Sequence, residues 1–240
     1  MKTENLKYSD GEITLQGYLA YDEMRMGKRP GVLVVHEAGG LGGHPKMRAR
    51  MLAKMGYIAF AVDLYGEGKC GASIEESRAM MNNLSKDPAV HRARANAGLK
   101  ALTVQPNVDK KRLAAIGFCF GGMTVLELAR NGAQLKGVVS FHGLLSTKVP
   151  AEPGQVNASV LVCNGAKDPL VPRSDVKAFE NEMQNAGADW QVINYGDTVH
   201  SFTNPWADGS DAPYILYNKR AAARAWAAMR EFFDEVLEAG

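Results

Sequence analysis

Cysteine is scarce in this sequence: only Cys70, Cys119 and Cys163 carry a thiol among 240 residues. The number is odd and no pair has the Cys-x-x-Cys spacing of a metal site, so we expect neither a disulfide framework nor a cysteine-ligated metal. Free thiols are typical of a reducing compartment, and we therefore expect a cytoplasmic protein.

An excess of either charge is also absent, because 28 Lys and Arg residues face 26 Asp and Glu residues and leave a formal net charge of +2. This balance gives no electrostatic reason to expect nucleic acid or an anionic membrane as a partner. No stretch approaches the roughly 18 consecutive apolar residues that span a bilayer. Residues 1–7 likewise lack the apolar run of a secretory signal.

What the sequence does contain is an alternation of strand-like and helix-like segments. Residues 11–20 have the pattern of a half-exposed antiparallel strand. Six later segments are short and mostly continuously apolar, as in strands covered on both faces: 31–35, 57–62, 113–116, 136–140, 159–162 and 190–193. Helix-length segments lie between and after them, at about 45–55, 75–85, 88–104, 121–131, 173–186 and 214–237.

This order predicts an α/β fold, with a mainly parallel sheet, an antiparallel N-terminal strand and helices on both faces. The last helix carries an apolar stripe from Ala222 to Leu237 and is expected to dock on the sheet. Because 46% of the residues are hydrophobic and no repeat or low-complexity linker divides the chain, we expect a single domain over residues 1–240.

The most informative motif is the run Gly-Phe-Cys-Phe-Gly-Gly at 117–122, directly after the strand 113–116 and before a helix. In such a strand–turn–helix the central residue adopts a strained backbone, and glycine on either side avoids a clash with the neighbouring elements. The turn would raise the Cys119 sulfur to a helix N-terminus, which favours an anionic sulfur. A small buried cysteine is the alternative interpretation of this motif alone.

Two later loops supply an acid and a base. Asp168 follows the strand 159–162, and His200 follows the strand 190–193. Because the carboxyl ends of parallel strands meet at one edge of a sheet, we expect both side chains to converge with Cys119. Taken alone, Asp168 is typical of a turn before proline and His200 of a surface loop. The order nucleophile, acid, histidine nevertheless favours the triad of the α/β-hydrolases.

With these residues the chain resembles the dienelactone hydrolase family, a branch of the α/β-hydrolase fold that uses a cysteine nucleophile. The matching stretches are His-Glu-Ala-Gly-Gly at 36–40, Asp-Leu-Tyr-Gly-Glu-Gly at 63–68, the motif at 117–122, Gly-Ala-Lys-Asp at 165–168 and His-Ser-Phe at 200–202. The resemblance implies a hydrolase of small esters or lactones. We expect it to need no metal or cofactor, to bind a small molecule and to be a monomer or homodimer.

The resemblance also implies roles for single residues. Cys119 would be the nucleophile, His200 the base and later the acid, and Asp168 the group that orients His200. The main-chain N–H groups of Phe120 and Ala38 would form the oxyanion hole.

Glu37 would lie near the thiol by the same resemblance. A carboxylate there disfavours a thiolate by like-charge repulsion and by accepting the thiol proton. Our hypothesis is that Cys119 rests as a neutral thiol until the substrate displaces Glu37. The alternative is that Glu37 is a solvated loop residue.

One departure from the family concerns the substrate. The family's namesakes hold a substrate carboxylate with arginines, one of them four residues after the histidine, where this chain has Asn204. Arg78 is either a charge in the cleft or an ordinary exposed side chain. Four aromatic residues suggest an apolar cleft for uncharged or aryl esters, although each also suits a core: Tyr65, Phe120, Phe202 and Trp206. Activated phosphotriesters are a further uncharged class that an oxyanion hole facing a thiol would suit.

Three other interpretations are weaker. The glycine-rich loop 39–45 resembles a dinucleotide fingerprint, but Pro45 stands in place of its last glycine. His36 and Glu37 begin the zinc-protease pattern H-E-x-x-H, whose second histidine is missing. His142 also follows a strand and is a rival base, but it precedes the acid in the chain.

A different class of function is a non-hydrolytic scaffold protein in which Cys119 is a redox-sensing thiol. Peroxide reactivity without ester turnover would favour it.

Overall fold

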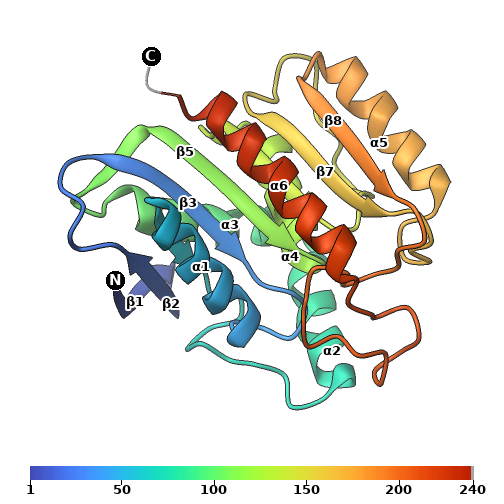
Figure 1. The fold of residues 1–240 in the computed structure, drawn as a ribbon, viewed down its shortest axis with the longest axis horizontal. Coiled ribbons are helices and arrows are strands. Elements are labelled where there is room, and N and C mark those ends of the chain that lie inside the picture. The colour runs from blue at the N-terminus through green and yellow to red at the C-terminus, as the bar shows by residue number, and fades with distance from the viewer. Residues whose placement is uncertain (239–240) are drawn as a thin grey trace.

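The computed structural model describes residues 1–238 and shows an eight-stranded sheet between two layers of helices (Figure 1). The strands lie in the order β1-β2-β4-β3-β5-β6-β7-β8. The hairpin of β1 (Lys2–Asp10) and β2 (Ile13–Tyr21) joins β4 antiparallel. The remaining strands are parallel: β3 (Arg29–Val35), β4 (Ile58–Ala61), β5 (Val108–Phe118), β6 (Gly137–Phe141), β7 (Ser159–Gly165) and β8 (Trp190–Tyr195).

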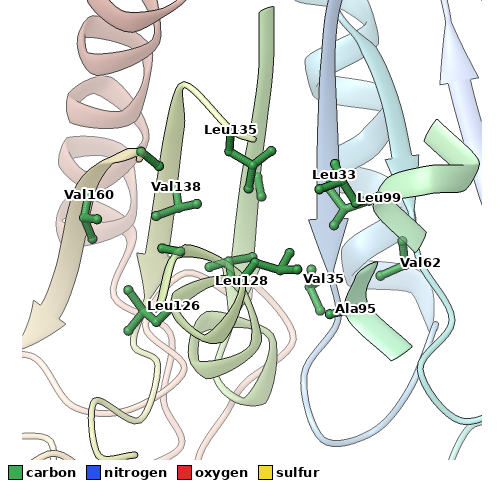
Figure 2. Close-up of a cluster of buried hydrophobic side chains, with 14 of the residues drawn as sticks. Leu33, Val35, Val62, Ala95, Leu99, Leu126, Leu128, Leu135, Val138 and Val160 are labelled. Atoms are coloured by element: carbon green, nitrogen blue, oxygen red, sulfur yellow. The ribbon is translucent and has the colours of Figure 1, made fainter. Parts of the chain in front are cut away.

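The parallel strands send alternate side chains into two cores, one on each face of the sheet. In β3, Leu33 and Val35 join the core covered by α3 (Pro88–Thr103), α4 (Phe120–Arg130) and α5 (Arg173–Ala186). Figure 2 shows the part of this core that α3 and α4 contribute. Val32 and Val34 join the other core, which is covered by α1 (Gly43–Met55) and α6 (Lys219–Val236). Burial on both faces is why these strands are continuously apolar in sequence.

The sequence-based expectation of an α/β-hydrolase sheet is confirmed, with two differences in detail. β1 is not among the predicted strands, because it lies at the sheet edge and its side chains are mostly polar and exposed. The last helix begins at Lys219 and not near residue 214. Residues 215 and 216 instead form bridges with His200 and Asp208, so this segment anchors the loop that carries the histidine.

The predicted single domain over residues 1–240 stays a prediction, and its last two residues lie outside the described part of the chain. Among the helices of residues 1–238, none combines the length and apolar character that crossing a membrane requires.

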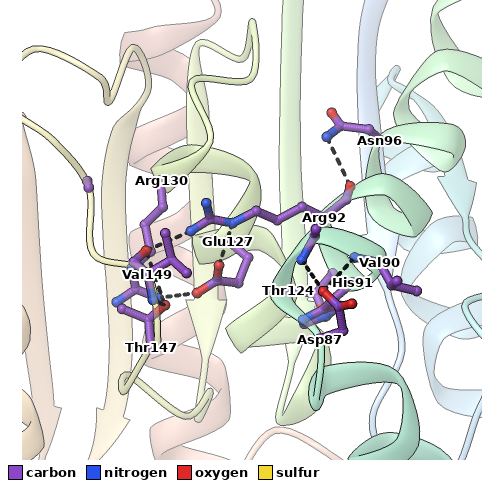
Figure 3. Close-up of polar contacts among 12 residues, drawn as sticks. Asp87, Val90, His91, Arg92, Asn96, Thr124, Glu127, Arg130, Thr147 and Val149 are labelled. Carbon is purple, nitrogen blue, oxygen red and sulfur yellow. Dashed lines mark hydrogen bonds and ion pairs between the residues drawn. The ribbon is translucent and has the colours of Figure 1, made fainter.

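A buried ionic network joins α3 to α4 beside the first core (Figure 3). Glu127 accepts hydrogen bonds from Arg92 at 2.8 Å and from Arg130 at 3.1 Å. Arg130 also pairs with Glu182 of α5 at 2.8 Å. The side chains of Glu127 and Arg130 are at most 2% exposed, so their charges depend on one another for compensation.

We predict that Glu127→Gln lowers the free energy of unfolding by about 3 kcal/mol, because it leaves buried guanidinium groups short of a carboxylate. Urea denaturation followed by circular dichroism measures this. Lys167→Ala breaks the exposed pair with Asp197 and serves as the control, for which we expect an unchanged midpoint. Equal midpoints for Glu127→Gln and the wild type would contradict the importance of the network.

Candidate active site

The predicted turn at Cys119 joins the end of β5 to the start of α4. Cys119 is half-buried. Its φ is 54°, a backbone conformation that L residues adopt only under strain. A Cβ on Gly117 would lie 1.9 Å from the carbonyl oxygen of Gly121, and a Cβ on Gly121 would lie 2.2 Å from that of Val35. Glycine at both positions is therefore a steric requirement of the turn.

Asp168 and His200 meet because the loops after β7 and β8 are hydrogen-bonded to each other. The N–H of Lys167 donates to the carbonyl of Thr198 at 2.9 Å, and Gly165 lies too close to this loop to carry a side chain. His200 Nδ1 then donates to Asp168 Oδ2 at 2.7 Å. Both residues are at least 96% buried, so the hydrogen bond fixes the orientation of the imidazole.

The other ring nitrogen of His200 is left available. Nε2 is buried and has no hydrogen-bond partner among the described residues, and His200 lines the same cleft as Cys119. Burial alone would lower the pKa of His200, but the charge of nearby Cys119 and the hydrogen bond to Asp168 raise it to about 10. The imidazole is thus a strong proton acceptor beside a thiol.

Two main-chain N–H groups make no backbone hydrogen bond within the described chain: that of Ala38, which lines the cleft, and that of Phe120, which directly follows Cys119. Buried His36 explains how the first is oriented. Its Nε2 accepts from the N–H of Leu64, so its Nδ1 donates to the carbonyl of Glu37 at 2.6 Å. This bond holds the Glu37–Ala38 peptide plane, and in a trans peptide the N–H of Ala38 then points the opposite way.

His142, the rival base, has both ring nitrogens engaged. Nδ1 accepts from the N–H of Cys119 at 3.2 Å, and Nε2 contacts the hydroxyl of Thr203 at 2.8 Å. Complete burial and the charge of His200 hold the pKa of His142 well below its ordinary value. A neutral ring without a free nitrogen suits support of the turn and not proton transfer.

Glu37 lines the same cleft as Cys119 but hydrogen-bonds other groups. Its Oε1 accepts hydrogen bonds from His44 Nδ1 and, at 3.3 Å, from Asn204 Nδ2, whereas no hydrogen bond joins it to Cys119 within the described residues. Burial would raise the pKa of Glu37, but the contact with His44 holds it below its ordinary value. Glu37 is also not a solvated loop residue, since only 17% of its side chain is exposed.

The cleft around Cys119 and His200 has a volume of about 560 Å³. Of the residues predicted to line it, Arg78, Asn204 and Trp206 do so. Phe202 does not, because it is fully buried against Tyr195 and His142. The remaining walls are mostly apolar: Ile74, Met81, Leu144, Leu170 and Ile215.

Tyr65 and Phe120 also do not line the cleft, and their contacts fit the alternative of core packing. Tyr65 stacks on the buried ring of Phe120 and donates its hydroxyl to the carbonyl of Ala38 at 2.9 Å, so it supports the loop from behind. Phe120 is fully buried and is not among the residues that line the cleft. No group of three His, Cys, Asp or Glu side chains in residues 1–238 is placed to hold a metal ion.

The chain is similar to several known proteins. The model of the dienelactone hydrolase family matches residues 15–237. The solved structure m3DLH is 46% identical, covers 99% of both chains and has a TM-score of 0.94. A dienelactone hydrolase-like promiscuous phosphotriesterase, P91 from metagenomic libraries, is 43% identical with the same coverage and TM-score. A Yersinia pestis protein named "Putative carboxymethylenebutenolidase" is 29% identical over 98% of this chain and 91% of its own.

The raised pKa of His200 predicts a pH-dependent contribution to stability. A histidine whose pKa is higher in the folded than in the unfolded chain stabilises the fold fully below about pH 6.5 and loses that contribution as the pH rises toward 10. We expect the difference in unfolding free energy between wild type and His200→Asn to be largest near pH 6 and to shrink up to pH 10.

The control is His91→Asn, because burial lowers the pKa of His91 to about 4. The contribution of His91 to stability then depends on pH in the opposite direction. Relative to His91→Asn, the wild type should lose stability as the pH falls from 6.5 to 4 and stay constant above pH 7. A flat pH profile for the His200 difference would show that Asp168 and Cys119 do not hold the proton.

Proposed function

Because the chain belongs to the dienelactone hydrolase family, we propose that this hydrolase cleaves small uncharged esters or lactones through a thioester on Cys119. The observation that carries the proposal is the orientation of His200. Asp168 occupies one ring nitrogen, and the other is free in the cleft that also holds the sulfur. That arrangement provides a nucleophile, a proton acceptor and a group that orients it.

In the proposed reaction the Cys119 sulfur attacks the ester carbonyl while His200 holds the thiol proton. The carbonyl oxygen becomes an oxyanion that accepts hydrogen bonds from the N–H groups of Ala38 and Phe120. The tetrahedral intermediate collapses to a thioester, and His200 Nε2 gives its proton to the departing alkoxide. Water then donates a proton to His200 and attacks the thioester, which releases the acid and restores the thiol.

The walls of the cleft favour substrates without a negative charge. Asn204, in place of an arginine, offers an amide that already hydrogen-bonds Glu37. Glu37 itself is an anion in the cleft, and the exposed Arg78 lies on the α2 wall (Ile74–Ser85). A carboxylate on the acyl group of a substrate would therefore be repelled by Glu37, and the exposed Arg78 would compensate its charge only in part.

A second candidate activity is the cleavage of activated phosphotriesters, favoured by the likeness to the promiscuous phosphotriesterase and by the mostly apolar walls of the cleft. The sulfur would attack phosphorus, displace the aryl oxide and form a phosphorylated cysteine that water hydrolyses. The oxyanion hole would receive the phosphoryl oxygen.

The proposal is tested by stopped-flow hydrolysis of p-nitrophenyl acetate with Cys119→Ala and His200→Ala. We expect each variant to lose at least a thousandfold in kcat/KM, because nucleophile and base act as a unit. Cys163→Ala, a change in the sheet core, is the matched thiol control and should stay within about threefold of wild type. Turnover that survives Cys119→Ala would refute the assignment, and peroxide reactivity without turnover would favour the redox alternative.

Substrate charge gives an independent prediction. We expect kcat/KM for p-nitrophenyl acetate to exceed that for mono-p-nitrophenyl succinate by at least tenfold, about 1.4 kcal/mol of discrimination against the carboxylate. Diethyl p-nitrophenyl phosphate should release nitrophenol slowly, and only with Cys119 intact. Equal rates on the acetate and the succinate would contradict the predicted preference for uncharged groups.

A further inference from the structure

We propose that His44 and Asn204 form a clamp that holds the Glu37 carboxylate away from Cys119, so that the thiol is a competent nucleophile before substrate binds. The inference rests on the proposed function, in which Cys119 is the nucleophile. His44, Asn204 and Arg48 act through Glu37 and are positioning residues. The substrate then does not have to displace Glu37 from the thiol before the reaction.

The first half of the clamp is built on one turn of α1. Arg48 stands four residues after His44, and its Nε donates to His44 Nε2 at 3.1 Å. A ring nitrogen that accepts a hydrogen bond carries no proton, so the proton of the ring resides on Nδ1. Nδ1 therefore faces Glu37 as a donor and hydrogen-bonds to its Oε1.

Arg48 is itself fixed and isolated from other acids. Its guanidinium lies 4.8 Å from the ring centroid of Trp226, and its Nη2 donates to the carbonyl of Thr203. The residue is 7% exposed and makes no ion pair with a carboxylate in residues 1–238. Since a buried cation is costly without compensation, its positive charge favours an ionised Glu37 on the far side of His44.

Asn204 forms the second half of the clamp. Its Oδ1 accepts from the N–H of Trp206 at 3.0 Å, which turns the amide so that Nδ2 points to Glu37. Both donors reach the same carboxylate oxygen, Oε1. The carboxylate is thus held from two elements distant in sequence, α1 and the loop after His200.

The position of this carboxylate matters because of the groups around it. The titratable or charged side chains near Glu37 or on the walls of its cleft include His36 from the loop after β3, His44 and Arg48 from α1, Arg78 and Asp211, and finally Cys119 and His200. Only the last two take part in the proposed proton transfer. A carboxylate released toward them would accept the thiol proton and repel a thiolate.

The test measures alkylation of Cys119 by iodoacetamide between pH 5 and 10, with the peptide that contains Cys119 quantified by mass spectrometry. This peptide is followed separately because Cys70 is exposed and would be alkylated as well. We expect His44→Phe to slow alkylation at pH 7 about tenfold and to move the midpoint of the profile up by about one pH unit. Asn204→Ala should shift it in the same direction by less.

Glu37→Gln distinguishes the clamp from a general structural role. In the double variants His44→Phe/Glu37→Gln and Asn204→Ala/Glu37→Gln, the profile should return to that of Glu37→Gln alone, because no carboxylate is left to move. His44→Asn keeps an N–H donor near the Nδ1 position and should retain most of the wild-type reactivity. Thermal unfolding of each variant checks that it is folded. If His44→Phe is not folded, the test uses Asn204→Ala and Asn204→Ala/Glu37→Gln.

Two results would overturn the clamp: slowed alkylation that persists without the Glu37 carboxylate, or wild-type profiles in both His44→Phe and Asn204→Ala. Alkylation requires no ester turnover. A protein that responds as expected here but hydrolyses no ester would refute the proposed function and leave the clamp intact. A protein that hydrolyses esters through Cys119 without this response would refute the clamp and leave the proposed function intact.

Discussion

Cys119 has a positive φ at the point where β5 passes directly into α4, and this backbone conformation costs about 1–3 kcal/mol that the surroundings must supply. They supply it by close contact of main chains: Gly117 packs on Gly121, and Gly121 on the end of β3. That contact brings the sulfur, the N–H of Phe120 and the loop after β3 to one edge of the sheet. Every other group of the site is arranged around this turn.

The histidines illustrate how neighbours assign different roles to one side chain. His36 and His44 each accept at Nε2, so each donates from Nδ1, the first to a carbonyl and the second to a carboxylate. His142 has both nitrogens engaged. In His200 one nitrogen faces Asp168 and the other has no hydrogen-bond partner among residues 1–238. An oriented ring nitrogen that is left available therefore distinguishes the proposed base from the supporting rings.

Much of this arrangement follows from local patterns. The apolar strands, the glycines at 117 and 121 and the loop positions of Asp168 and His200 depend on short-range periodicity and on the geometry of parallel sheets, and sequence conveys both. The proposed roles of these residues stay predictions until they are tested. The start of α6 was placed five residues too early because the bridges of residues 215 and 216 to the histidine loop are long-range contacts.

The polar support of the site was not predictable in the same way. His44 and Arg48 have helical spacing, which a sequence shows, but nothing in it tells that their partner is Glu37. Tyr65 and Phe202 are aromatic residues next to motif positions, and whether such a ring faces a cleft or a core depends on packing between distant elements. Side-chain direction within loops is the part that requires the three-dimensional structure.

The central claim is that acyl transfer passes through Cys119. The most direct measurement is rapid acid quenching of the protein with p-nitrophenyl acetate, followed by mass spectrometry of its peptides. The account predicts one acetyl group on the peptide that contains Cys119, formed within the first turnover and lost as the ester is consumed. Turnover with the acetyl group on another residue, or with none on Cys119 at any quench time, would contradict it.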